Sequence, residues 1–212
     1  LAADSLAEAY AIIAHKKRVD LTHAFGPDTP VWRGFGQAAM GAAADPDTHQ
    51  PYTIATHGFR TTFYAMVGQY GTHVDPPAHF DEQGRTMDEI PLEEMLVPLV
   101  VIDITPRLTA EPNHAAYGAS GRQPNAFAAL RTDMAKDFER DPARFKRAPF
   151  PGWSLDAVRF LFEQRGIVAI GHESLDTDAS ADFAAEAWVL KHGHWQIEAM
   201  ANLDQVPPTG AL

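Results

Sequence analysis

The chain has 212 residues, a formal net charge of −11, ten histidines and no cysteine. This length predicts one domain over residues 1–212, which can carry a protruding hairpin. The charge disfavours nucleic acids and anionic membranes as partners, and no run approaches the roughly 20 apolar residues of a membrane span. The absence of cysteine excludes disulfides, thiolate catalysis and zinc sites built on Cys.

The first third of the chain predicts one helix, short strands and a long loop. Apolar residues recur at helical spacing behind a suitable N-cap, Ser5, so a helix is expected over residues 5–15. Residues 26–51 contain Gly and Pro throughout and predict a loop, and loops of this length in compact domains are usually functional. Short strands are predicted over residues 19–23, and an antiparallel pair over 53–54 and 59–67.

The remaining two thirds alternate continuous apolar runs with helical stripes. Ser154 caps and Gly166 ends the clearest helix, over residues 154–165. A second helix is expected over 182–191 and a helical turn over 90–95. Buried strands are predicted over residues 97–104, 126–132, 167–170 and 195–200. The pattern indicates an α/β protein with more strand than helix.

A histidine and an aspartate at alternate positions form the most informative motif. His73 and Asp75 point to the same face if they lie in a strand. The two prolines that follow end the strand, and the turn allows His79 to return over that face. Imidazole and carboxylate together suit zinc or manganese. The structural alternative is a surface turn in which Asp75 bonds its own backbone.

The motif resembles the signature of a known family. Residues 69–80 read Gln-Tyr-Gly-Thr-His-Val-Asp-Pro-Pro-Ala-His-Phe. They resemble the pattern His-x-x-x-His-x-Asp-x-x-x-His-Phe of the metal-dependent cyclase family, which includes bacterial kynurenine formamidase and isatin hydrolase. Residues 19–23, 29–32 and 193–203 are similar to its opening strand, its substrate-facing loop and its late strand. The resemblance implies a swivelling β/β/α domain, mostly β around a buried metal-site cavity.

Two positions depart from the family pattern. Gln69 replaces the first His of the signature, and Glu186 replaces a His twelve residues before the late carboxylate, Glu198. The family uses these two histidines to complete a second metal site, so the changes predict one divalent ion or altered ligands. Oxygen donors shift the preference toward manganese or magnesium and away from zinc. The expected ligands are His73, Asp75, Glu198, Gln69 and Glu186.

Several of these residues have a structural alternative. Gln69 either binds the ion or hydrogen-bonds a ligand, and Glu186 either binds it or faces solvent. Glu198 lies among apolar residues, where an unpaired carboxylate is costly. His79 resembles the family's general acid or base, and an ordinary pKa near ~6.5 suits that role. Its alternative is a hydrogen bond that fixes the turn.

Four further residues are candidates for contact with a substrate. His172 follows a buried strand and either lines the pocket or caps a loop. The other three are aromatic and can wall an aromatic substrate, although single aromatic residues more often belong to the core: Trp32, Phe35 and Phe80.

These features predict a metal-dependent hydrolase of an amide, lactam or lactone. The metal would acidify a water and polarise the carbonyl, and His79 would carry the proton to the leaving group. The nearest activity by resemblance is that of an arylformamidase, which converts N-formylkynurenine to kynurenine and formate in tryptophan catabolism. A rival from another class is a non-catalytic protein that binds a small ligand or metal on the same fold.

The resemblance also carries expectations about assembly and chain ends. A homodimer or homotetramer is expected, as in the relatives. The family's C-terminal strand is expected to be missing from this chain. A start at Leu1 fits either a mature exported protein, which would be periplasmic, or a trimmed chain, which would be cytoplasmic.

Overall fold

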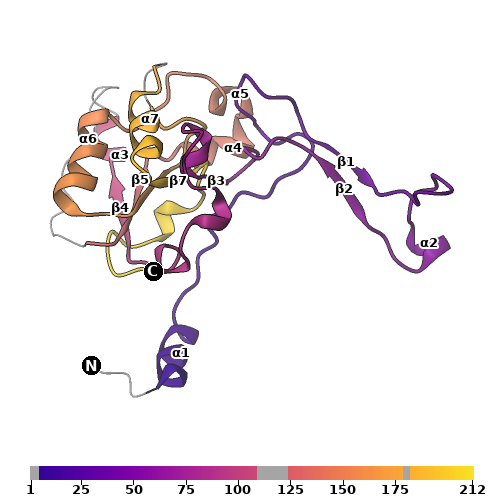
Figure 1. Ribbon diagram of the computed structural model, residues 1–212, viewed down its shortest axis with the longest axis horizontal. Coiled ribbons are helices and arrows are strands. Elements are labelled where there is room, and N and C mark those ends of the chain that lie inside the picture. The colour runs from indigo at the N-terminus through magenta and orange to yellow at the C-terminus, as the bar shows by residue number, and fades with distance from the viewer. Residues whose placement is uncertain (1–4, 109–123, 179–181) are drawn as a thin grey trace.

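A five-stranded sheet forms the centre of the computed structural model, which describes residues 5–108, 124–178 and 182–212 (Figure 1). Four strands run parallel, and the short edge strand β3 pairs antiparallel with β7. The strand order across the sheet is β3 (His73–Asp75), β7 (Trp195–Glu198), β6 (Ala169–His172), β5 (Phe127–Arg131) and β4 (Leu99–Asp103). This arrangement confirms the predicted α/β class with a mainly β centre.

Both faces of the sheet are buried, which explains the continuous apolar runs of its strands. On β5, Ala128 and Leu130 join one hydrophobic cluster, and Phe127 and Ala129 join another. The first cluster includes residues of α6 (Leu155–Arg159), of the π-helical turn that follows it (Phe160–Arg165) and of α7 (Ala184–Lys191). The second lies under the 3-10 turn Leu203–Gln205.

Helix ends follow the local sequence signals. The Ser154 side chain accepts a hydrogen bond from the amide of Ala157, and Gly166 ends the helical run with a φ of 69°. At the N-terminus, α1 (Leu6–Ala14) begins at its cap Ser5, as predicted. The remaining helices are short: α2 (Ile54–His57), α3 (Thr105–Leu108), α4 (Asp137–Arg140) and α5 (Pro142–Phe145).

A hairpin arm projects from the body (Figure 1). It consists of β1 (Ala39–Ala42) and β2 (Thr62–Ala65), which pair antiparallel, with α2 near its tip. Two sequence predictions were wrong here. Residues 53–54 are not a strand, because Thr53 caps α2 by accepting from the amide of Thr56. The partner of β2 comes instead from the segment expected to be a loop.

The predicted strand over residues 19–23 is also wrong. Thr22 makes one isolated antiparallel bridge to Met200, and the pairing does not extend. The predicted strands over 97–104, 126–132 and 195–200 are confirmed with slightly shorter bounds, and the strand predicted over 167–170 lies two residues later, at 169–172. Within the described ranges, none of the helices combines the length and the apolar character that crossing a bilayer needs.

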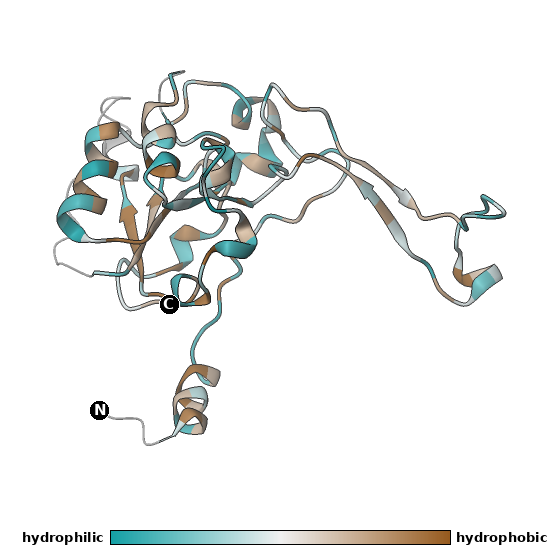
Figure 2. Ribbon diagram, in the orientation of Figure 1, coloured by the Kyte–Doolittle hydropathy of each residue, from teal (hydrophilic) through white to brown (hydrophobic). Residues whose placement is uncertain are grey.

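The arm and α1 contain hydrophobic residues (Figure 2), and the large side chains among them are exposed. An isolated two-stranded hairpin and a nine-residue helix are both marginal in water without packing. None of the residues of α1 is buried. The exposed side chains of α1 are Leu6, Tyr10, Ile12 and Ile13, and those of the arm are Ile54, Phe59, Phe63, Tyr64 and Met66.

Close packing around Gly171 of β6 gives a test of this core. A Cβ atom there would lie 2.5 Å from Sδ of Met200 and 2.6 Å from Cζ of Phe127. Gly171→Ala is therefore expected to lower the free energy of unfolding by about 1–3 kcal/mol, measured by urea denaturation. Gly36→Ala is the control, because a Cβ there meets nothing within 4 Å, and its effect should stay within about 0.5 kcal/mol. Equal stability of the two variants would contradict this packing.

Candidate metal centre

The register between β3 and β7 brings the central residues together. His73 lies directly opposite Glu198 in the antiparallel pair, and Asp75 lies opposite Gln196. Opposite residues of such a pair share a face of the sheet, and so do residues two apart in one strand. His73 Nε2 consequently lies 3.4 Å from Asp75 Oδ2 and 3.7 Å from Glu198 Oε2. The prediction that His73 and Asp75 lie on the same face of a strand is confirmed.

His73 is oriented with one free ring nitrogen toward the carboxylates. Its Nδ1 lies 3.0 Å from the carbonyl oxygen of Gly71, which leaves Nε2 as the nitrogen available to a ligand. This Nε2 is buried and makes no well-aligned hydrogen bond to any described residue. Ligand atoms of His73, Asp75 and Glu198 all lie within 4.8 Å of one another. One imidazole nitrogen that has no hydrogen-bond partner, together with two carboxylate donors, fits a divalent metal ion.

Two further groups of potential ligands adjoin this centre. Asp75, His79 and Glu186 form one, and Asp176, Asp178 and Glu186 form the other. In the second group, Asp178 already accepts from the amides of Ala185 at 2.7 Å and Glu186 at 3.0 Å. Asp178 therefore satisfies the N-terminus of α7, which is an ordinary role for a carboxylate.

One buried amide holds the carboxylates in place. Gln196 Nε2 lies 3.2 Å from oxygens of Asp75, Glu186 and Glu198, and Thr177 donates to Gln196 Oε1 at 2.8 Å. The donor end of the amide thus points at three acids at once. The sequence reading missed Gln196, although its position two residues before Glu198 in a strand signals the same face.

The charges of the cluster shift its titration. Burial alone lowers the pKa of His73, but the Asp75 carboxylate beside it, and then the charge of Glu198, raise it to about 9. Burial also opposes ionisation of Asp75, yet His73 and His79 hold the pKa of that carboxyl below its usual range. Burial, together with the charges of Glu198 and Asp75, raises the pKa of Glu186 to about 10. Without metal, His73 and Glu186 both keep a proton at neutral pH.

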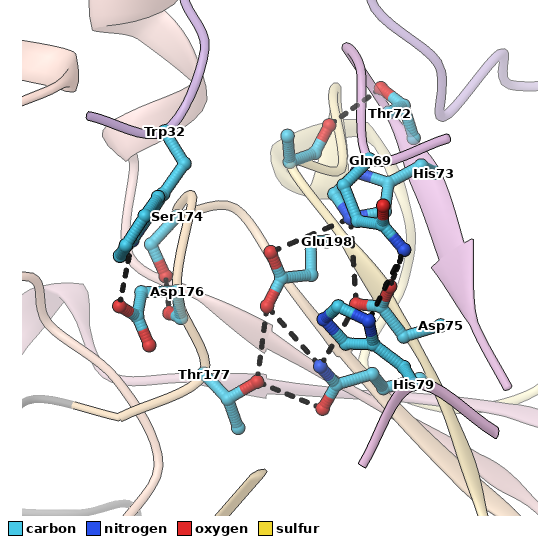
Figure 3. A network of polar contacts seen from close by, with 12 residues as sticks. Trp32, Gln69, Thr72, His73, Asp75, His79, Ser174, Asp176, Thr177 and Glu198 are labelled. Carbon is cyan, nitrogen blue, oxygen red and sulfur yellow. Dashed lines mark hydrogen bonds and ion pairs between the residues drawn. The ribbon is translucent and has the colours of Figure 1, made fainter. Parts of the chain in front are cut away.

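Gln69 and Glu186, the two departures from the family signature, both point toward the centre. Gln69 Nε2 lies 3.2 Å from Asp75 Oδ1 and 3.4 Å from His79 Nδ1, so in this arrangement its amide orients both groups (Figure 3). Glu186 is 5% exposed, so the alternative that it faces solvent does not hold. His79 is exposed at the cavity and belongs to a short 3-10 turn, Pro77–His79, directly after β3.

The centre lies at one end of a cavity of about 340 Å³. Trp32, Phe35 and Phe80 line it, at the positions named from the sequence. His172 is not among its lining residues. It is fully buried behind Glu198, with its Nε2 3.3 Å from Glu198 Oε1. Lining residues that the sequence reading missed are Leu175, Asp176 and Phe183.

Comparisons with known proteins show which proteins this chain is similar to. The kynurenine formamidase of Paracidovorax citrulli (strain AAC00-1) is 29% identical over 147 residues, which are 68% of this chain and 65% of that protein. The chain thus spans slightly less than two thirds of that relative's length. Cyclase-like protein 1 of Arabidopsis thaliana is 25% identical over 188 residues, 84% of this chain and 69% of that protein.

Solved structures share the fold. Isatin hydrolase A from Labrenzia aggregata superposes with a TM-score of 0.78 at 27% identity, covering 95% of this chain and 89% of that chain. Isatin hydrolase A from Ralstonia solanacearum gives a TM-score of 0.80 at 23% identity, covering 99% and 90%. These neighbours confirm the predicted cyclase fold. Residues 19–179, well over half of the chain, match the model of the family described as Putative cyclase. The chain belongs to this family.

Proposed function

We propose that this protein is a metal-dependent hydrolase of an amide, lactam or lactone bond in a small aromatic substrate. The observation that carries the proposal is the convergence of His73, Asp75 and Glu198, with His79 beside them, at the end of an aromatic cavity. Cavities of this size, largely apolar with a few convergent polar groups, are typical of small-molecule sites. N-formylkynurenine or a related aromatic compound is the substrate that the family suggests.

Names of the relatives support hydrolysis. They include kynurenine formamidases, isatin hydrolases and a potential metal-dependent hydrolase with cyclase activity. The Labrenzia isatin hydrolase A was solved with benzyl benzoate, an aromatic ester. An aromatic ring joined to an acyl group is common to these molecules, and it suits a cavity with a metal centre at one end.

Each residue of the centre has a role in this proposal. His73, Asp75 and Glu198 would hold one manganese, zinc or magnesium ion, with Glu186 and the oxygen of Gln69 as further donors. Such an ion acidifies water and polarises a carbonyl. To take a proton from the attacking water, His79 needs Nε2 free and its ring hydrogen on Nδ1, which lies 3.4 Å from the Gln69 amide; the oxygen end of that amide would then accept from Nδ1. His79 can then deliver the same proton from Nε2 to the leaving nitrogen or oxygen.

Oligomerisation is part of the proposal. The arm and α1 both need a covering surface, and a second copy of the chain, in a homodimer or homotetramer, would supply it. The rival function, a binding protein without catalysis, keeps the same centre but predicts no turnover with any metal.

A matched pair of variants tests the assigned roles. Asp75→Ala is expected to lose most bound metal, because it removes a charged ligand, whereas His79→Ala should keep metal. His79→Ala should nevertheless lose about 10²–10⁴-fold in kcat, the usual contribution of an acid–base group. The measurements are elemental analysis and hydrolysis of isatin, formanilide and N-formylkynurenine. Full metal content in Asp75→Ala would show that Asp75 is not a ligand. Parental turnover in His79→Ala would show that His79 is not the acid–base group. A parent without activity would favour the binding protein.

Metal binding is expected to release protons. His73 must be neutral to bind an ion, and its pKa of about 9 leaves it protonated at pH 7 in the metal-free protein. The apparent affinity should therefore rise with pH up to about 9 and fall in acid. Calorimetric titration with manganese at pH 7, in buffers with different ionisation enthalpies, should show release of about one proton, or about two if Glu186 also ionises. Manganese binding without proton release would contradict a protonated His73 in the metal-free protein.

The arm provides a test of assembly. Phe63→Ser combined with Tyr64→Ser removes two exposed apolar side chains from β2; the Tyr64 ring also lies 6.1 Å from that of Phe25, measured between ring centroids. Light scattering after size-exclusion chromatography should show an oligomer for the parent and a smaller mass for the double variant. Leu92→Ser is the control, because Leu92 is equally apolar but lies on the body and is 82% exposed. A monomeric parent would refute the oligomer.

A further inference from the structure

The wall of the cavity that faces the metal centre carries an acid. Asp176 lies in the loop after β6, is 8% exposed and lines the cavity. In Figure 3, Trp32 and Asp176 lie on one side of Glu198, with His73 and His79 on the other. An oxygen of Asp176 lies within 4.8 Å of one of Glu186, so Asp176 adjoins the centre on the side opposite His79, and a molecule whose reacting bond lies at His79 can extend toward it.

Asp176 is held but not neutralised. Its Oδ2 accepts from Trp32 Nε1 at 3.3 Å, and its Oδ1 accepts a long hydrogen bond of 3.4 Å from the amide of Asp178. Among the described residues it forms no ion pair with Lys or Arg. A carboxylate oxygen can accept about two hydrogen bonds, so each oxygen keeps capacity for a donor in the cavity.

Aromatic rings connect this acid to the metal centre. Measured between ring centroids, Phe183 lies 6.4 Å from Trp32 and 6.3 Å from Phe80. The centroid of Phe80 lies 5.1 Å from that of His79. Phe183 has a φ of 53°, an unfavourable conformation for a bulky residue. Such strain persists where the surroundings impose it, often at functional sites. Flat walls of this kind orient an aromatic ring between the two ends.

Apart from His73 and His79, the ionisable side chains that line the cavity are all acids. The carboxyl groups of Asp75, Asp176, Glu186 and Glu198 line it, and no Lys or Arg does so among the described residues. A metal ion held by His73, Asp75 and Glu198 would offset the charge of its own ligands most, and Asp176 is not one of these three. A carboxylate on the far end of a substrate would therefore lose its hydration without gaining a counter-ion, which is costly.

We propose that Asp176 determines substrate specificity, on the basis of the hydrolase function above. It selects aromatic substrates that carry an ammonium or N–H donor on the side away from the scissile bond, and it excludes those with a carboxylate there. Trp32 holds Asp176 in position through its indole N–H and forms part of the adjacent wall.

Three probes of one shape test this inference on the metal-loaded full chain. They are benzamides with an aminomethyl, a methyl or a carboxylate group at the 3- or 4-position, so that the far ends are small groups that differ mainly in charge. Calorimetry should show the aminomethyl probe binding about tenfold or more tightly than the methyl probe, and the carboxylate probe about tenfold or more weakly. In Asp176→Asn the three affinities should converge to within about threefold.

Controls separate the alternatives. Glu93→Gln removes one exposed acid from the body and should keep the parental order of affinities. An unchanged order in Asp176→Asn, equal binding of all probes by the parent, or no binding at all would overturn the inference. So would loss of metal from Asp176→Asn, since Asp176 would then be a ligand. Turnover of isatin and formanilide is measured separately: an inactive parent that still ranks the probes refutes hydrolysis but supports charge selection by Asp176.

Discussion

Burial of several carboxylates around one point is the constraint on which the rest of this structure depends. Asp75, Glu186 and Glu198 each place an oxygen 3.2 Å from the same amide nitrogen of Gln196. Like charges about 4 Å apart repel by about 4 kcal/mol at the effective dielectric constant of partly buried sites. The metal-free chain relieves this repulsion with protons, because the pKa of His73 rises to about 9 and that of Glu186 to about 10. A divalent ion competes with these protons for the same oxygens and nitrogen.

The strand register and one tight turn fix the position of each donor side chain in this cluster. A slip of one residue between β3 and β7 would send His73 and Asp75 to the opposite face of the sheet. A backbone hydrogen bond stabilises the turn after β3, since the amide of Ala78 donates to the carbonyl oxygen of Arg85 at 3.0 Å. Gly84 packs so closely on this turn that a Cβ atom would lie 2.6 Å from the carbonyl carbon of Pro77. The position of His79 thus depends on backbone contacts rather than on its own side chain.

The parts of the site that follow from local periodicity were predictable, and the parts made by long-range packing were not. His73 and Asp75 could be identified because a strand repeats every two residues, and the central strands because both sheet faces are buried. Asp176 and Phe183 belong to loops, where no periodicity marks the side chains that face a cavity. The Phe183 ring also depends on a positive φ, which no sequence pattern of this chain indicates. The sequence predicted β2 of the arm but not β1, because pairing of short strands depends on the partner rather than on the strand itself.

Packing couples the arm to the aromatic wall. Val31, Ala38 and Tyr70 form a small buried cluster at the base of the arm, against which Phe35 and Val67 pack. Trp32 follows Val31 directly and donates its indole hydrogen bond to Asp176. Protein interiors are close-packed and transmit displacements instead of absorbing them. A surface that covers the arm and fixes its direction therefore also fixes the segment that carries Trp32 and Phe35, so assembly and the shape of the cavity are not independent properties of this chain.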